Sequence, residues 1–404
     1  MAERAEDPAP GATDGIHEVR LKPGRHRALE GCPWIFRGEL LRHEVPTGSV
    51  VQVLDSTGRF VGRGLYSATS AIAVRLLSWT RTVAVDGALV RDRIRRAVEF
   101  RRRLYPDRQA MRLVNSEADG LPGLIVDRYG PMLVMQVLAA GLMPFYDDIV
   151  EALVEAVDPE GIYERGAVPV RRYEALPLED RLAWGRWISP VEVEEHGLRL
   201  TVDLAEGQKT GHFFDQYENR DRATRNAAGL DVADVFCYTG AFGLLAAARG
   251  AASVVGVDSD PDAVGRAEAN AAANGLAHRT RFVTANAFDW LRAESAGGPA
   301  YDLVILDPPA FTKSRASREA ALRGYREINL RALKLVRPGG QLVTSSCSYH
   351  VSLDDFIAVV GQAAHDAHRH VRLLAVGGQA PDHPVHPALP ESRYLKCLFL
   401  AVEE

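Results

Sequence analysis

Cysteine is scarce in this chain of 404 residues. The four cysteines, Cys32, Cys237, Cys347 and Cys397, lie far apart, a pattern that suggests neither a disulfide framework nor a zinc site. No apolar run reaches the roughly 18 residues that a membrane span needs, and the polar stretch 1–15 lacks the apolar core of a signal peptide. We therefore expect a cytoplasmic protein with reduced thiols, no metal and no membrane partner.

Lysine is also scarce, since only five of the 48 basic residues are lysines. The net charge of −5 taken alone argues against a nucleic-acid partner. The arginines are clustered, however: segment 59–81 holds four arginines and no carboxylate, and segment 91–112 holds nine arginines and three carboxylates. Local positive charge suits a polyanionic partner. The alternative is that arginine is simply abundant here and that 91–103 is the solvated face of a helix.

The length predicts two or three domains. Residues 1–15 have the composition of a disordered tail. Segment 16–84 favours short strands separated by turn residues, which indicates a small β-barrel-like domain. Segment 85–190 mixes helices (86–104, 145–157) with a hairpin (124–137), as in an α+β domain. Segment 191–404 alternates strands with helices, which predicts a doubly wound α/β sheet.

The clearest motif lies in segment 232–258. A buried strand is followed by a turn with Tyr238 and Gly240, a helix, and a second strand that ends on Asp258. Glycine lets the backbone approach a ligand, and the Asp258 carboxylate can accept hydrogen bonds from ribose hydroxyls. Because the turn lacks the full G-x-G-x-x-G spacing for a pyrophosphate, we favour S-adenosylmethionine over NAD. The alternative is an ordinary turn with Asp258 capping the helix that starts at Pro261.

Two further segments suit the same cofactor. The glycine- and phenylalanine-containing loop 207–220 would enclose a ligand with a sulfonium group and a charged tail, although it could also be a cap ahead of an ordinary helix. Asn286, at the end of the third strand, can donate to and accept from an adenine edge, with Ala287 beside it. The additional cofactor residues expected from these segments are Lys209, Thr210, Phe214, Asp215, Asn286 and Ala287.

A carboxylate and a thiol follow the next two strands. The fourth strand ends in Asp307-Pro308-Pro309, and two prolines force the backbone out of the sheet, which presents Asp307 to the cleft. Phe311 could then stack on a base. Cys347 comes directly after the fifth strand, beside Asp307. The alternative is that Cys347 is a small buried apolar side chain, as free cysteines commonly are.

The N-terminal segment resembles a PUA domain, a small RNA-binding module. The residues that carry this resemblance are Gly24–Arg27, Gly31–Phe36, Gly48–Val53 and Gly62–Tyr66. The resemblance implies RNA contacts by Arg25, Arg27 and Trp34, in addition to Phe311. Alternatively, Trp34 fills the core of the domain.

Over residues 17–404 the chain resembles the bacterial large-subunit rRNA cytosine-carbon-5 methyltransferases. The most specific elements are Gln208–Gln216, Asp307–Phe311 and Ser346-Cys347-Ser348. The resemblance implies a class I S-adenosylmethionine-dependent methyltransferase fold with Cys347 as nucleophile. Many other RNA cytosine methyltransferases carry a second cysteine after the Asp-Pro pair, and Ala310 stands at that position here.

The chemistry fits this assignment, because carbon 5 of cytosine is too electron-poor to accept a methyl group unaided. A thiolate added to carbon 6 activates it, with Asp307 holding the base edge. The base must leave its stack, so we expect locally single-stranded ribosomal RNA as substrate. Two alternatives stay open: methylation of a guanine or adenine nitrogen without a covalent adduct, and a non-catalytic RNA-binding assembly factor. The oligomeric state is also open, a homodimer included.

Overall fold

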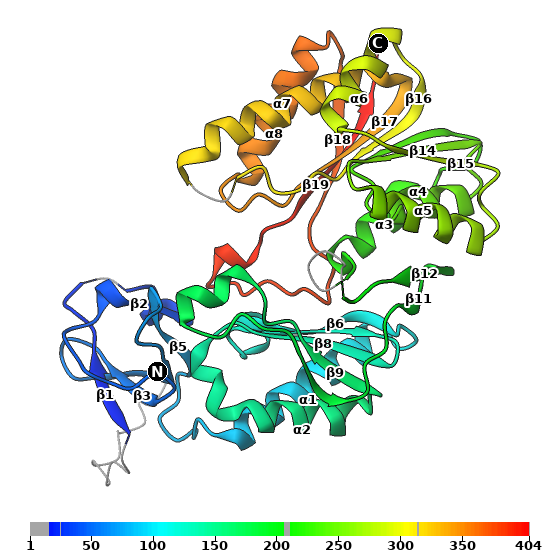
Figure 1. Cartoon of the computed structure of the whole chain (residues 1–404). Coiled ribbons are helices and arrows are strands. Elements are labelled where there is room, and N and C mark those ends of the chain that lie inside the picture. The colour runs from blue at the N-terminus through cyan, green and yellow to red at the C-terminus, as the bar shows by residue number, and fades with distance from the viewer. Residues whose placement is uncertain (1–15, 25, 206–210, 313–314, 404) are drawn as a thin grey trace, which may run out of the picture.

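The computed structural model describes residues 16–24, 26–205, 211–312 and 315–403. The predicted tail 1–15 and the predicted contact residues Arg25, Lys209 and Thr210 lie outside these ranges. Three domains follow one another along the chain, each with its own sheet (Figure 1). Within the described residues, no helix combines the length and the apolar character needed to cross a bilayer.

The N-terminal domain is an open five-stranded sheet in the order β1-β3-β4-β5-β2. Its strands are β1 (His17–Arg20), β2 (Trp34–Phe36), β3 (Val50–Leu54), β4 (Phe60–Tyr66) and β5 (Ile72–Ser78). The strands are rich in β-branched residues and bury one apolar core. In the described part of this domain β1 pairs only with β3 and β2 only with β5, so β1 and β2 share no ladder. The predicted barrel is therefore wrong as a closed structure.

The middle domain packs two helices on a second five-stranded sheet, in the order β10-β9-β8-β7-β6. Asp86 caps the first helix by accepting a hydrogen bond from the Leu89 N–H at 2.9 Å. The predicted hairpin 124–137 is confirmed as β7 and β8. The elements are α1 (Gly87–Leu104), β6 (Ala110–Asn115), β7 (Leu124–Tyr129), β8 (Met132–Val137), α2 (Tyr146–Val157), β9 (Gly161–Glu164) and β10 (Arg181–Gly185).

The C-terminal domain contains a seven-stranded sheet in the order β15-β14-β13-β16-β17-β19-β18. Its first five strands are parallel, so their carboxyl ends lie at one edge, whereas β19 runs antiparallel to both neighbours. The strands are β13 (Asp231–Val235), β14 (Ser253–Asp258), β15 (Thr280–Thr284), β16 (Tyr301–Leu306), β17 (Val336–Ser346), β18 (Val371–Gly377) and β19 (Lys396–Val402).

In the part of this domain that the structure describes, six α-helices accompany the sheet: α3 (Tyr217–Thr224), α4 (Ala241–Ala248), α5 (Pro261–Ala273), α6 (Ala287–Glu294), α7 (Arg318–Leu335) and α8 (Leu353–Asp366). Helix α7 begins at Arg318. Gly324 lies within the helix, where an added Cβ would be 3.1 Å from the ring of Phe311. The glycine therefore makes room for an aromatic side chain and does not start the helix.

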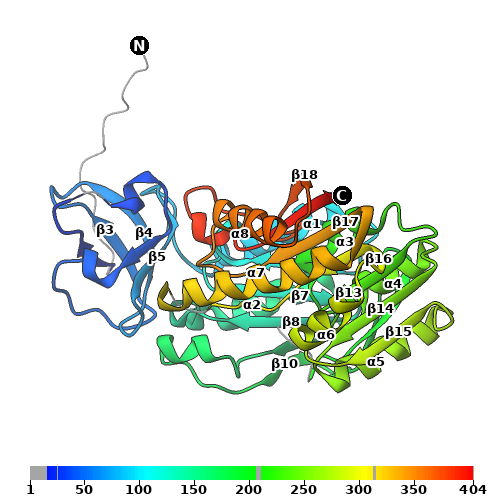
Figure 2. The same cartoon turned by 90° about the horizontal axis from the view of Figure 1, so that it is seen from above.

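Two connections join the middle and C-terminal domains. The hairpin β11 (Val191–Glu195) and β12 (Leu198–Val202) packs with apolar residues of both. Segment 378–395, between β18 and β19, leaves the sheet, crosses the middle domain and returns (Figures 1 and 2). We call it the strap. Arg101 donates to the Asp382 carbonyl at 2.8 Å, and Asn115 donates to the Pro384 carbonyl at 2.9 Å.

Candidate active site

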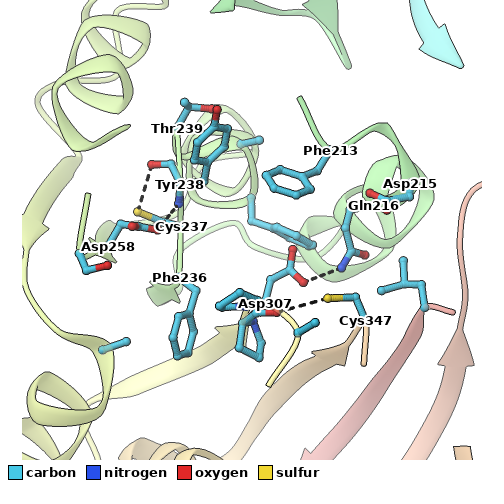
Figure 3. A pocket seen from close by; sticks show the side chains of 18 of the residues that line it. Phe213, Asp215, Gln216, Phe236, Cys237, Tyr238, Thr239, Asp258, Asp307 and Cys347 are labelled. Atoms are coloured by element: carbon cyan, nitrogen blue, oxygen red, sulfur yellow. Dashed lines mark hydrogen bonds between the residues drawn. The ribbon is translucent and has the colours of Figure 1, made fainter. Parts of the chain in front are cut away.

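A cavity of about 440 Å³ opens at the carboxyl edge of the parallel strands (Figure 3). This edge is where open α/β sheets bind their ligands. The lining includes most of the predicted cofactor residues together with both predicted catalytic residues. Predicted residues in the lining are Asp215, Tyr238, Asp258, Asn286, Ala287, Asp307, Phe311 and Cys347, and further lining residues are His212, Phe213, Gln216, Phe236, Cys237, Thr239 and Pro308.

Asp258 is the last residue of β14, and its carboxylate accepts a hydrogen bond from the turn between β13 and α4. Its Oδ2 accepts the Tyr238 N–H at 2.8 Å, and its Oδ1 accepts the Asp260 N–H at 3.1 Å. Asp260, not Asp258, caps α5 by accepting the backbone N–H groups of residues 262 and 263. The alternative in which Asp258 is merely that helix cap is therefore wrong, and its carboxylate lines the cavity.

Gly240 determines the backbone conformation of the turn that borders the cavity. It has a φ of +83° at the start of α4, and an added Cβ would lie 2.9 Å from the ring of Phe282. Left-handed backbone and close packing together favour glycine there. Its neighbours Thr239 and Ala241 line the cavity, so Gly240 acts on the ligand through the shape of the turn.

Asn286 lines the cavity and also caps α6. Its side-chain oxygen accepts the N–H groups of Phe288 and Asp289 at 3.0 and 3.3 Å. The oxygen is thus engaged by the helix, which leaves the NH₂ group as the donor toward a base edge. Ala287 follows it in the lining.

Phe214, a predicted cofactor residue, is not among the described residues that line the cavity. Its side chain is 2% exposed and packs against Tyr129, with ring centroids 4.9 Å apart. Phe213 lines the cavity instead. The two neighbours point in different directions where the chain enters a 3-10 turn, and the sequence showed two adjacent phenylalanines without showing which one faces inward.

Gln216 is a site residue that sequence reasoning missed. Its Nε2 donates to Asp307 Oδ1 at 2.8 Å and to the Ser345 hydroxyl at 3.2 Å. Asn219 in turn donates to Gln216 Oε1 at 2.6 Å. An amide within the motif 208–216 was the available signal, but its partner lies 91 positions away.

Asp307 and Cys347 lie together, as expected from two adjacent strands. β16 and β17 are parallel with Leu306 opposite Thr344, so the residues that follow each strand share one end of the sheet. The Cys347 thiol donates to the Pro308 carbonyl at 3.8 Å. In Figure 3 the side chains of Gln216 and Cys347 both point toward the loop that carries Asp307.

Cys347 differs from the other cysteines in its exposure. It is half-buried and lines the cavity, whereas Cys32, Cys237 and Cys397 are buried. Burial raises the pKa of the Cys397 thiol to about 12 and that of the Cys237 thiol well above its ordinary value. Those two side chains are therefore protonated near neutral pH and are poor nucleophiles.

The predicted RNA-contact residues lie apart from one another. Phe311 lines the cavity, with its ring centroid 4.6 Å from that of Tyr325. Trp34 donates its indole N–H to Glu117 of the middle domain at 2.8 Å. Arg27 makes two hydrogen bonds of 2.6 Å to Glu391 in the strap. Both N-terminal side chains thus contribute to domain contacts.

The strand order and the carboxylate that ends the second strand of the parallel sheet define a nucleoside-binding α/β fold of the class I methyltransferase type. Comparison with known families agrees. Residues 168–391 match the model of the S-adenosylmethionine-dependent methyltransferases, and residues 19–79 match a PUA-like domain. The chain belongs to the S-adenosylmethionine-dependent methyltransferase family, and S-adenosylmethionine is its cofactor.

Similar proteins match along almost the whole chain. The ribosomal RNA large subunit methyltransferase I of Shewanella amazonensis is 39% identical over 391 residues, which cover 95% of this chain and 99% of the relative. The protein of the same name from Pseudoalteromonas atlantica is also 39% identical, with the same coverage. Among solved structures, SMU.776 complexed with SAH superposes with a TM-score of 0.82 at 21% identity, covering 96% of this chain and 100% of that one.

Proposed function

We propose that this enzyme methylates carbon 5 of a cytosine in large-subunit ribosomal RNA through a covalent adduct with Cys347. The observation that carries the proposal is the pairing of Cys347 and Asp307 at neighbouring strand ends within one cavity. The names of the relatives, ribosomal RNA large subunit methyltransferase I, support the substrate class. An rRNA substrate also supports a cytoplasmic location.

In the proposed cycle Cys347 supplies the nucleophile. Its sulfur bonds to carbon 6 of the cytosine, and the electron pair of the 5,6 double bond moves toward carbon 5 and the ring. Asp307, oriented by Gln216, holds the ring-nitrogen and amino edge of the base. S-adenosylmethionine, when bound, would supply an electrophilic methyl group for carbon 5 and would leave as S-adenosylhomocysteine. Loss of the carbon-5 proton then restores the double bond and expels the sulfur as thiolate.

The cofactor would be held by residues already in the lining. Asp258 is suited to the ribose diol, Asn286 and the backbone of Ala287 to the adenine edge, and Tyr238 to the turn between them. Asp215 lies at the opposite side, where its Oδ2 accepts the Tyr394 hydroxyl at 2.6 Å. We place Lys209 and Thr210 near the charged tail on the sequence motif alone.

RNA recognition is assigned to residues 16–84 with help from Phe311. Positive charge from arginine suits a phosphate backbone, and Phe311 at the cavity suits a flipped base. We divide the chain into this domain, a middle domain at 85–190 and a catalytic domain at 191–404. Ala310 stands where a second cysteine would be, so product release proceeds without a second thiol.

RNA that carries 5-fluorocytosine tests the proposal. Carbon 5 of this base carries fluorine in place of the hydrogen that must be lost as a proton, so the covalent adduct cannot break down and accumulates. We expect a covalent complex with the wild type and with Cys32→Ser, whose cysteine is buried in the N-terminal domain. Cys347→Ser should form none on a denaturing gel. Nitrogen methylation predicts that Cys347→Ala keeps nearly full methyl transfer, and an assembly factor predicts cofactor binding without any transfer. Either result would overturn the proposal.

A further inference from the structure

A buried lysine lies directly behind the turn that carries Cys347. Lys396 is the first residue of β19 and pairs with Ser346 in the antiparallel ladder, one position before the thiol. Its side chain is 4% exposed. The ammonium donates to the Ser348 carbonyl at 2.8 Å and to the Val351 carbonyl at 2.9 Å. These two carbonyls belong to the turn that follows Cys347.

The charge of Lys396 is not balanced by a close carboxylate. Across the described ranges, no acidic oxygen lies within ion-pair distance of Lys396; Asp355 on α8, which acts on it from farther away, is paired with Arg318 at 2.6 Å. Burial lowers the pKa of Lys396 to about 8, and the Cys347 thiol acts in the opposite direction. A buried cation without a counter-ion is costly. Ionisation of the nearby thiol would supply that counter-ion.

Among the described residues, the other titratable groups around this turn are not buried cations. Tyr325 of α7 shares a 2.8 Å hydrogen bond with the Ser348 hydroxyl, and burial raises its pKa, so it stays neutral. Asp307 is an acid at the end of the neighbouring strand. Arg393 is basic, but it is exposed to solvent, where its field is screened.

We propose that Lys396 is a positioning residue that keeps Cys347 in its thiolate form and fixes the turn that presents it. This inference rests on the proposed function only in its claim that the thiolate attacks the base. Lys396 lies outside the cavity lining that holds Cys347 and Asp307 and touches neither base nor cofactor. It acts through the charge it places behind the sulfur, as cations beside reactive cysteines commonly do.

A purely structural role would need only the two hydrogen bonds. Lys396→Gln keeps a hydrogen-bond donor but removes the positive charge. Lys396→Arg keeps both the donor and the charge. Arg393→Gln removes the same charge from an exposed position in the same segment and is the matched control. The readout is the rate at which iodoacetamide alkylates Cys347 as a function of pH, followed by mass spectrometry of the Cys347 peptide in the full-length protein.

In the wild type we expect half-maximal reactivity below pH ~8.5, the ordinary pKa of cysteine. Lys396→Gln should raise that midpoint by about one pH unit, which means roughly tenfold slower alkylation near pH 7. Lys396→Arg and Arg393→Gln should stay near the wild-type midpoint. A wild-type midpoint at or above ~8.5 would overturn the inference even if Lys396→Gln does not fold, and so would a folded Lys396→Gln with an unchanged midpoint.

The same proteins separate this inference from the proposed reaction. If the thiol midpoint shifts with Lys396 but the wild type forms no complex with 5-fluorocytosine RNA, the electrostatic role stands and the covalent reaction fails. If the complex forms and the midpoint does not depend on Lys396, the reaction stands and this inference fails.

Discussion

Asp307 is oriented by a short chain of amides. Asn219 donates to Gln216, and Gln216 donates to the carboxylate of Asp307. All three are positioned before any substrate arrives, which is how a site holds a reactive geometry without reorganisation. The carboxylate that we expect to hold the base is thus oriented by residues of α3 and of the turn ahead of it.

Gln216→Glu tests this arrangement with almost no change in volume. The substitution removes the hydrogen-bond donor to Asp307 and places a second acid beside it. The Asp307 carboxylate therefore loses the bond that orients it and is repelled by a like charge. Loss of a hydrogen bond to a charged group costs about 1.5–3 kcal/mol. We therefore expect single-turnover methyl transfer to slow roughly 10–100-fold, with folding midpoints unchanged. A rate within twofold of the wild type would contradict the role.

At the scale of elements, β13 carries an acid in an unusual position. Asp234 is fully buried, and its Oδ2 accepts the Gly243 N–H of α4 at 2.8 Å. Among the described residues its Oδ1 has no hydrogen-bond partner. Burial raises the pKa of Asp234 to about 7, and the charges of Asp307 and Asp258 act in the same direction. The acid that ties β13 to α4 is thus close to titration at neutral pH.

Asp234→Asn keeps the acceptor for Gly243 and removes the titration. For an acid whose pKa is raised on folding, the stabilising contribution is complete below the ordinary pKa of about 3.9 and is lost as pH rises through about 7. The wild type should therefore lose stability relative to Asp234→Asn between pH 5 and 8, by a few kcal/mol at most. Urea unfolding at several pH values measures this, and parallel curves would contradict it.

Elements and motifs followed from the sequence where the signal is local. Adjacent residues encode three of these features: the strand-turn-helix around Tyr238, the end of the fourth strand at Asp307-Pro308-Pro309, and the thiol after β17. Contacts between distant residues carried no such signal. Gln216 and Asp307 are separated by 91 positions and Lys396 and Ser348 by 48, so only folding brings them together. Sheet closure in the N-terminal domain depends on edge pairing, which composition does not reveal.

At the scale of the molecule, the strap joins all three domains. Its Asp382 is 0% exposed and lies against the middle domain, where it accepts the Arg112 N–H at 3.1 Å and contacts Arg108 at 3.4 Å. Its Glu391 pairs with Arg27 of the N-terminal domain at 2.6 Å. Tyr394 reaches the cofactor side of the cavity through Asp215. The strap therefore links the PUA-like domain, the middle domain and the methyltransferase domain through one stretch of chain.

Two substitutions in the strap should differ strongly in cost. Asp382→Asn removes the nearer of the two carboxylates beside buried Arg108, at 3.4 Å against 4.0 Å for Glu195, which costs on the order of 3–5 kcal/mol. Glu391→Gln removes the partner of a partly exposed arginine, which costs about 1 kcal/mol or less. Denaturant unfolding of both variants measures the difference. Equal losses would show that Asp382 is not a buried counter-ion.

The strap also sets the order in which the protein is completed during synthesis. Arg108 leaves the ribosome about 270 residues before Asp382, whose carboxylate lies 3.4 Å from its guanidinium. At ~5–20 residues per second, a nascent chain carries Arg108 without Asp382 for roughly 15 to 50 seconds. The middle domain is therefore complete only after the strap has been synthesised, long after the strands of its own sheet.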